Sequence, residues 1–330
     1  MRKMGTKSTI LKYVALVLGA VFLVTSVLVF SYYWDEIHST APNGGGASDV
    51  IRYHGKEYVP KGNLETFLVL GLDKYEGEGS ADSYNNDKQA DFLMLFVFDN
   101  ATESFSAIHI NRDTMANVRI LAVDETKVVG TVTKQIALAH TYGRGKETSC
   151  RNTKDSVEDL LPGVTVNHYV SVTMDSVATM NDFVGGVEVT VLDDFTGIDA
   201  TLIKGETVTL RGEQALHYVR TRYGLEDSSN NTRMDRQQQY IQALYDKTMA
   251  CAEEDDEFLL RLIDTMDDYV VYDSSNYKMQ KFVEKFNHYT FKGITELEGE
   301  TKKGEKFMEF YPTSESIMKV VVDLFYKPKD

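Results

Sequence analysis

Hydrophobic and polar positions along the chain predict an early block of three strands. Apolar runs of strand length, rich in β-branched and aromatic residues, occupy 66–72, 92–98 and 104–110. The short, turn-forming link at 99–103 predicts that the second and third strands form an antiparallel hairpin. We expect the first strand to pair antiparallel with the second through the polar loop 74–90.

This pairing places charged residues at one rim of the predicted sheet. Asp73 ends the first strand and Asp91 opens the second, so the two carboxylates are expected side by side. The third strand ends at the same edge and delivers Arg112 and Asp113. Mg²⁺ typically takes one or two carboxylates together with substrate phosphate. The pattern therefore indicates a site for chemistry at this rim.

Beyond residue 127 the pattern predicts helices interleaved with strands. Gly185-Gly186 fits a helix stop between the predicted helix 174–183 and the strand 187–191. The other predicted elements are a hairpin at 53–60, helical segments within 127–161 (136–139 and 153–161), a strand at 164–172, a short helix opened by 210–213 that runs into 218–222, helices at 233–251, 257–266, 275–291 and 314–325, and paired strands at 296–299 and 306–311. This alternation indicates an α/β fold, an αβα sandwich with a central mixed β-sheet.

The N-terminal region predicts a membrane anchor. Residues 13–33 carry no charge and match the ~20 residues that span a bilayer as a helix. Basic residues precede this run and acidic residues follow it, which predicts a cytoplasmic N-terminus and an extracellular domain at the cell membrane. A cleaved signal peptide is the alternative, although the run exceeds the usual ~7–15 apolar residues. The predicted organisation is a cytoplasmic tail (1–12), a transmembrane helix (13–33), a linker with the hairpin (34–62) and an extracellular domain (63–330).

The net charge argues against one class of function, and the two cysteines raise the question of a disulfide. The net charge of −15 argues against a general nucleic-acid binder, which usually carries a basic surface. Cys150 and Cys251 are the only cysteines, and outside the membrane they are able either to form a disulfide or to remain separate thiols. The sequence leaves that choice open.

Arginines gather in two segments of this acidic chain. Arg220 and Arg222 are two residues apart, so in extended backbone they point to one side. Arg233, Arg236 and Gln237 are expected in the first turn of a long helix, where backbone N–H groups also favour an anion. Guanidinium groups match phosphate oxygens in a bidentate manner, so an anion site is predicted. The alternative is a set of solvated surface arginines.

Seven motifs occur together in a fixed order. They are GLD (71–73), QAD (89–91), INRDT (110–114), KQIALAHTYG (134–143), VGGVEV (184–189), LRGEQALHYVRTR (210–222) and RMDRQQQ (233–239). Over about residues 64–250 the chain thereby resembles the LytR-CpsA-Psr family. The resemblance implies an α/β/α sandwich with a pocket for a polyprenyl lipid. It also implies attachment of anionic glycopolymers, such as teichoic acid or capsular polysaccharide, to peptidoglycan in a Gram-positive-type envelope.

The resemblance further implies a phosphotransfer from undecaprenyl pyrophosphate to a sugar hydroxyl of peptidoglycan. It assigns Mg²⁺ to Asp73 and Asp91. Arg112 and Arg220 would act on the reacting pyrophosphate, and Asp113 would orient Arg112. The remaining pyrophosphate-binding residues that it implies are Arg222, Arg233, Arg236 and Gln237. The general base would be Asp227, with Asp235 as the other candidate.

The chain departs from the family pattern at three positions. Tyr75 and Gln89 stand where many members carry arginine, and Asn230 stands where aspartate is frequent. Residues 251–330 carry no recognisable motif. Two other functions remain open at this stage: a hydrolase of the same polyprenyl-pyrophosphate glycan, and a non-catalytic module that senses wall precursors.

Overall fold

The computed structural model of the chain describes residues 50–72, 88–125, 127–143, 146–221, 224–225, 229–255, 257–273, 285–286 and 289–329. The predicted transmembrane helix at 13–33 lies outside these residues. So does Tyr75, which departs from the family pattern. None of the helices within the described ranges is long and apolar enough to cross a membrane.

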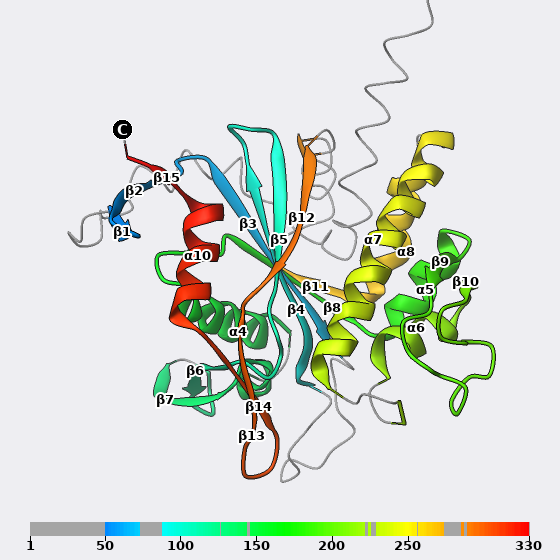
Figure 1. Cartoon of the computed structure of the whole chain (residues 1–330), viewed down its shortest axis with the longest axis horizontal. Coiled ribbons are helices and arrows are strands. Elements are labelled where there is room, and N and C mark those ends of the chain that lie inside the picture. The colour runs from blue at the N-terminus through cyan, green and yellow to red at the C-terminus, as the bar shows by residue number, and fades with distance from the viewer. Residues whose placement is uncertain are drawn as a thin grey trace, which may run out of the picture.

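A six-stranded mixed sheet forms the centre of the molecule, in the order β11-β8-β3-β4-β5-β12 (Figure 1). Its strands are β3 (Leu64–Leu72), β4 (Ala90–Asp99), β5 (Ser104–His109), β8 (His168–Thr173), β11 (Val270–Tyr272) and β12 (Thr290–Glu296). β4 pairs antiparallel with both β3 and β5, as the early apolar runs predict. β8 joins β3 in parallel and β12 joins β5 in parallel, so the sheet is mixed, as expected.

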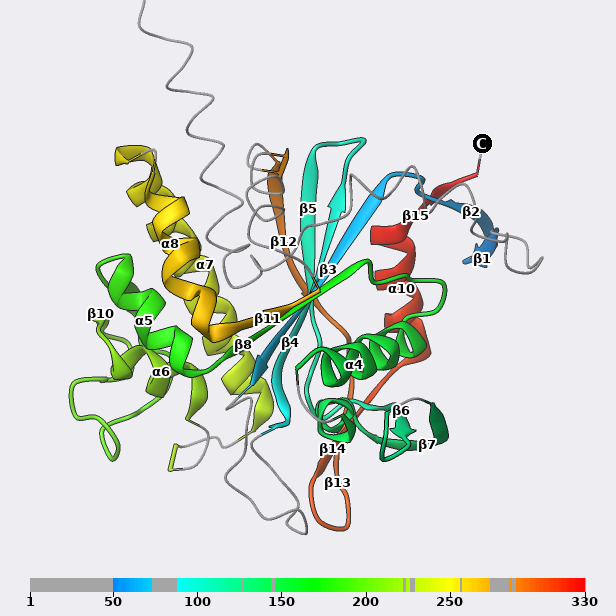
Figure 2. The ribbon, with the colours of Figure 1, turned by 180° about the vertical axis from the view of Figure 1, so that it is seen from behind.

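Helices cover both faces of the sheet, which gives the predicted three layers (Figures 1 and 2). One layer contains η2 (Ile136–Tyr142), α4 (Lys146–Leu160) and α10 (Ser314–Phe325). The other contains α5 (Asp175–Phe183), α6 (Glu213–Arg220), α7 (Asn230–Glu254) and α8 (Phe258–Met266), followed by η3 (Asp267–Tyr269). In β3, Phe67 and Val69 belong to the core under α5–α8, and Leu68 and Leu70 belong to the core under α4 and α10. Because both faces are buried, the strand is a continuous apolar run rather than an alternating one.

Short strands complete the fold. β1 (Ile51–Tyr53) and β2 (Lys56–Pro60) form the predicted hairpin, and β15 (Tyr326–Pro328) pairs with β2. β9 (Val187–Thr190) pairs with β10 (Thr207–Leu210). The predicted C-terminal hairpin is present as β13 (Gly299–Lys303) and β14 (Met308–Pro312). Both strands begin a few residues later than predicted.

Several predicted elements are wrong or shifted. Within 127–161, the two helical segments predicted at 136–139 and 153–161 are present in η2 and α4. The earlier part of that range is a strand instead, because β7 (Val128–Gln135) forms a hairpin with β6 (Met115–Leu121). The β-branched residues of β7 explain why a strand is preferred there. The predicted helix 275–291 ends differently, since Thr290 and Phe291 lie in β12, and most of its remaining residues lie outside the described ranges.

The two cysteines are free thiols on different layers of the fold. Cys150 belongs to α4 and is buried in the core under α4 and α10. Cys251 belongs to α7 and packs against the other core. The central sheet separates them, so the disulfide alternative is wrong for this fold.

Candidate functional site

The predicted carboxylate and arginine meet at the rim of the sheet. Arg112 follows β5, and its Nη1 lies 2.5 Å from Oδ1 of Asp91 at the start of β4. Arg233 reaches the same carboxylate from α7, with its Nη1 3.9 Å from Oδ2 of Asp91. The side chains of Asp91 and Arg112 are mostly buried, at 15% and 12% exposure. One aspartate therefore lies between two guanidinium groups from different elements.

Neighbouring polar groups orient Arg112. Gln89 accepts a hydrogen bond from Nη2 of Arg112. Asp113 lies on the other side, with its Oδ1 3.7 Å from Nε of Arg112, and Gln135 donates to that same Oδ1 at 2.8 Å. Asp113 thus lies where it orients Arg112. Gln89, noted above only as a departure, also orients Arg112.

Asparagines orient Arg233, and the sequence analysis did not identify them as site residues. Asn230 accepts a hydrogen bond from Nη2 of Arg233, and its own amide donates to Oδ1 of Asn111 at 2.8 Å. Asn111 also accepts the backbone N–H of Asp113 at 2.9 Å. The spacing of three residues between Asn230 and Arg233 on a helix was the signal that could have shown their contact.

The long helix begins earlier than predicted, which changes the positions of its polar residues. Ser229 caps α7 at its N-terminus by accepting the N–H of Thr232 at 3.4 Å. Arg233 therefore completes the first turn, while Arg236 and Gln237 belong to the second. The prediction that all three share the first turn is wrong.

Arg236 is fully buried and faces away from Asp91. Its Nη1 lies 3.3 Å from Asp193, its Nη2 donates to the carbonyl of Thr221 at 2.5 Å, and its guanidinium carbon lies 5.1 Å from the Phe195 ring centroid. Gln237 donates to the carbonyl of Val219 at 3.1 Å. Both side chains thus hold the C-terminal end of α6 in place.

The other predicted site residues fall into two groups. Arg220 is the last residue of α6 and is exposed, so the expectation of extended backbone there is wrong. Asp235 lies on α7, and burial raises the pKa of its carboxyl, with a further contribution from a neighbouring carboxylate. Asp73, Arg222 and Asp227 lie outside the described residues, so their roles stay predictions.

A buried histidine adjoins the arginine pair and was also missed. His109 ends β5, and its ring lies 5.0 Å from the Phe92 ring. Gln238 of α7 places its amide nitrogen 3.3 Å from Nδ1 of the imidazole. Burial, together with the charge of Arg233, lowers the pKa of His109 to about 3. The imidazole is therefore neutral at physiological pH.

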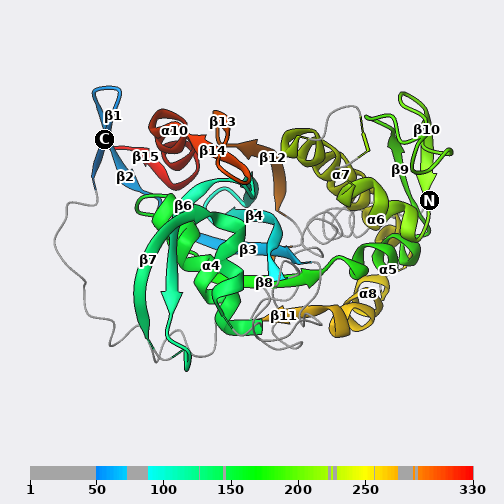
Figure 3. The same cartoon turned by 90° about the horizontal axis from the view of Figure 1, so that it is seen from below.

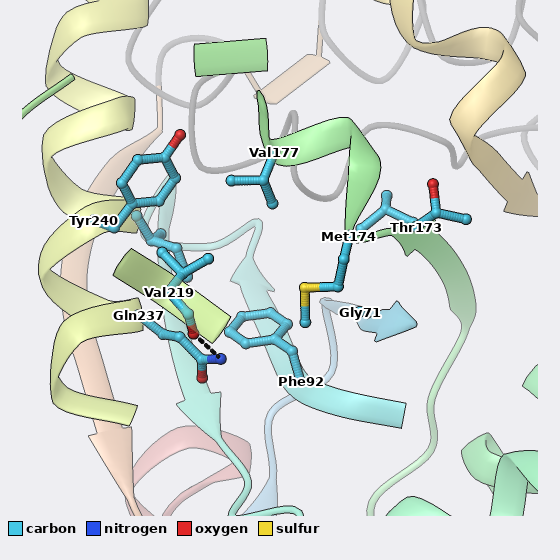
Figure 4. A pocket seen from close by; sticks show the side chains of 10 residues that line it. Gly71, Phe92, Thr173, Met174, Val177, Val219, Gln237 and Tyr240 are labelled. Atoms are coloured by element: carbon cyan, nitrogen blue, oxygen red, sulfur yellow. Dashed lines mark hydrogen bonds between the residues drawn. The ribbon is translucent and has the colours of Figure 1, made fainter. Parts of the chain in front are cut away.

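An apolar pocket opens between the sheet and helices α5–α7 (Figure 4). Phe92 and Met174 lie side by side on one wall, and Tyr240 and Val177 lie across from each other beyond them. Gln237 also lines the pocket and stands one helical turn from Arg233. The charged rim and the apolar pocket are therefore adjacent, which suits an anionic lipid.

Asp91 fits the role of a metal ligand in part. Its carboxylate is a hard oxygen ligand of the kind Mg²⁺ prefers. Its Oδ1 is buried and has no hydrogen-bond partner besides the ion-pair contact with Arg112. Within the described ranges, no group of three or more His, Cys, Asp or Glu side chains is placed to hold a metal ion. A metal held here would need further ligands, such as Asp73 and phosphate oxygens.

Comparisons with known proteins identify the family of this chain. A model described as the LytR_cpsA_psr family matches residues 48–321. The polyisoprenyl-teichoic acid–peptidoglycan teichoic acid transferase TagU of Bacillus subtilis is 29% identical over 243 residues, which cover 73% of this chain and 71% of TagU. TagU of Enterococcus faecalis is 27% identical over 245 residues, covering 72% of each chain.

Solved structures share the fold. The crystal structure of B. subtilis TagV has a TM-score of 0.60 at 23% identity, and covers 79% of this chain and 96% of TagV. The structure of TagT bound to LI-WTA has a TM-score of 0.59 at 21% identity, and covers 84% of this chain and 95% of TagT. At these identities the likeness shows the mixed α/β fold alone.

Proposed function

The chain belongs to the LytR_cpsA_psr family, and on this premise we propose that it is a phosphotransferase that attaches an anionic glycopolymer to peptidoglycan. The donor would be a teichoic acid or capsular polysaccharide on undecaprenyl pyrophosphate. The names of the TagU relatives support a transferase activity on teichoic acid and peptidoglycan. The helix predicted at 13–33 would hold the catalytic domain at the outer face of the cell membrane.

One observation carries the proposal: two guanidinium groups converge on a single carboxylate next to Phe92 of an apolar pocket. Arg112 and Arg233 are both largely buried, where electrostatic interactions are stronger than in water. A pyrophosphate carries more negative charge than Asp91 and would bind the same pair of arginines. The lipid attached to it would extend into the adjacent pocket lined by Phe92 and Met174.

The residues present suit phosphoryl transfer. An acceptor hydroxyl oxygen forms a bond to the phosphorus that bears the glycan, the bridging P–O bond breaks, and polyprenyl phosphate leaves. Arg112 and Arg233 hold the phosphate oxygens and neutralise their charge, which is the main requirement of this chemistry. The hydroxyl proton passes to a carboxylate, either Asp227 or Asp235.

Asp91 and Asp73 are the residues that would hold Mg²⁺, which supplies further positive charge against the pyrophosphate when bound. Arg220 and Arg222, at and beyond the end of α6, would complete the anion site. Arg236 supports them indirectly, because it binds the carbonyl of Thr221 between them.

The test uses the full chain in detergent with a synthetic polyprenyl-pyrophosphoryl glycan and a peptidoglycan oligomer, with and without Mg²⁺. Mass spectrometry of the acceptor detects a phosphate-linked glycan. We expect a metal-dependent product that Arg112→Met and Asp91→Asn abolish. Arg119→Met is the matched control, since Arg119 forms a partly exposed pair with Asp155 away from the site.

The outcomes separate the candidate functions. A linked product from the wild type and the control alone supports the transferase. Release of free glycan phosphate without a linked product indicates a hydrolase. Donor binding without turnover of several glycans indicates a sensing module, and it would refute the catalytic proposal.

A further inference from the structure

The hairpin β13–β14 exposes large apolar side chains close to the site. Phe307 is 59% exposed, Met308 45% and Tyr311 40%. Lys303 and Lys306 flank the turn in a chain whose net charge is −15. Exposed large apolar side chains that gather in one short segment make that segment a candidate interaction surface.

The hairpin is tied to the backbone of the arginine segment. The N–H of Phe310 donates to the carbonyl of Asp113 at 2.8 Å, and Phe310 forms a parallel bridge with Thr114. Gln135 donates both to the Met308 carbonyl and to the Asp113 carboxylate, at 2.8 Å in each case. Phe307 stands three residues before Phe310, which is about 10 Å along a strand. The exposed tip is thus held near Arg112.

The hairpin and the pocket lie on opposite sides of the sheet. Phe310 belongs to the core under α4 and α10, whereas Phe92 and Met174 of the pocket belong to the core under α5–α8. Seen from below, β13–β14 and α5–α8 lie on different sides of β3 and β4 (Figure 3). In phosphoryl transfer the attacking and leaving oxygens lie roughly in line. A lipid phosphate that leaves toward the pocket therefore requires an acceptor that arrives from the hairpin side.

We propose that the tip of hairpin β13–β14, residues 302–308, binds the polysaccharide acceptor. The ring of Phe307 offers an apolar face that packs on the C–H face of a sugar ring. Lys303 and Lys306 offer ammonium donors to carboxylates of the acceptor. The inference rests on the proposed function, because the in-line argument requires a phosphoryl transfer.

Co-sedimentation of the detergent-solubilised full chain with purified peptidoglycan sacculi tests the inference. We expect Phe307→Ala, and separately the double variant Lys303→Ala and Lys306→Ala, to bind sacculi about fivefold more weakly, the change that a loss of about 1 kcal/mol produces. Val123→Ala is the matched control, since Val123 is 89% exposed at the turn of the other hairpin, β6–β7. Sacculus binding by Phe307→Ala equal to that of the wild type would overturn the inference.

A second measurement distinguishes an error in the proposed acceptor surface from an error in the proposed transferase function. Binding of synthetic polyprenyl pyrophosphate, followed by native mass spectrometry, is expected to be unchanged in Phe307→Ala, because the donor lies across the sheet. Weaker donor binding in this variant would contradict the separation of the two subsites. Absence of glycan transfer by the wild type, with sacculus binding that still depends on Phe307, would count against the reaction and not against the acceptor surface.

A reporter variant distinguishes a glycan from a lipid surface. Phe307→Trp places an indole at the tip, and the wild type, with Trp34 alone, provides the background signal. The signal of the introduced indole is the difference in emission between the variant and the wild type. We expect soluble peptidoglycan fragments to shift this emission and phosphatidylglycerol vesicles to leave it unchanged. A shift with vesicles and none with fragments would replace the acceptor by a membrane surface.

Discussion

Replacement of Asp91 by asparagine tests whether its carboxylate occupies the place of a substrate pyrophosphate. Asparagine keeps the shape of the side chain and removes its charge. Arg233 then loses this counter-charge, and Arg112 keeps only the more distant Asp113, whose Oδ1 lies 3.7 Å from its Nε. At an effective dielectric constant of about 20, the separations of 2.5 Å and 3.9 Å correspond to Coulomb energies of about 7 and 4 kcal/mol. Desolvation offsets most of this attraction, and loss of one partner from a buried pair typically costs about 3–5 kcal/mol.

We therefore expect Asp91→Asn to lower the free energy of unfolding by about 3 kcal/mol, measured by urea denaturation of the full chain in detergent without divalent metal. Added inorganic pyrophosphate should raise the stability of the variant more than that of the wild type. The anion supplies the missing negative charge in the variant, whereas in the wild type it must first displace Asp91. The difference should shrink as salt screens the anion.

Asp159→Asn provides the control, because Asp159 pairs with Arg119 at 3.5 Å and is 36% exposed. An exposed pair of this kind contributes at most about 1 kcal/mol. Equal stability of Asp91→Asn and the control, or equal stabilisation of wild type and Asp91→Asn by pyrophosphate, would refute the assignment of an anion site to Arg112 and Arg233.

Three further predictions concern groups near and away from the site. Arg236→Met should lower the free energy of unfolding by about 3 kcal/mol or more, since it leaves buried Asp193 without its arginine partner. Exposed Arg220→Met should change the free energy of unfolding by less than about 1 kcal/mol and should lower turnover instead. Urea titrations of both variants test this, and equal losses of stability would contradict the buried position of Arg236 and the exposed position of Arg220. The pKa of His109 is lowered to about 3, so below about pH 6.5 the unfolded chain binds more protons than the folded chain, and the free energy of unfolding should fall on acidification. His109→Gln should reduce this loss of stability between pH 7 and pH 5 by up to about 2 kcal/mol. An unchanged pH dependence of stability in the variant would show that His109 is not held neutral. Burial raises the pKa of Cys150 to about 12, and it also raises the pKa of the less buried Cys251. Maleimide should therefore label Cys150 more slowly than Cys251 in the native protein. Denatured unreduced protein should show two thiols by Ellman's assay, and a count of zero would indicate a disulfide.

Local sequence pattern was sufficient for much of the sheet and for some helices. The block β3–β4–β5 could be predicted because its strands are contiguous apolar runs and one short turn sets the pairing. Asp91 and Arg112 followed as neighbours from that antiparallel pairing. Helix α10 has the predicted bounds, since Thr313 caps it by accepting the N–H of Ser316 at 3.1 Å, a local signal.

The prediction was wrong where the spacing of the side chains is compatible with both a helix and an extended strand. The range 127–161 was predicted as broadly helical, with helical segments at 136–139 and 153–161, but the β-branched residues at its start form β7 against β6. Likewise Arg220 and Arg222 were assigned to extended backbone, whereas α6 continues to Arg220. A short polar segment carries too few apolar positions to set its period.

Only the tertiary structure decided which arginines face Asp91. Arg233 and Arg236 lie three residues apart on α7, yet Arg233 faces Asp91 and Arg236 faces Asp193. The difference depends on where α7 begins and on how the helix packs between the sheet and α6, and both depend on contacts between distant parts of the chain. The pairing of hairpin β13–β14 with the segment after β5 has the same origin. The sequence by itself therefore determined the strands and the residues able to bind phosphate, and long-range packing determined which of them converge.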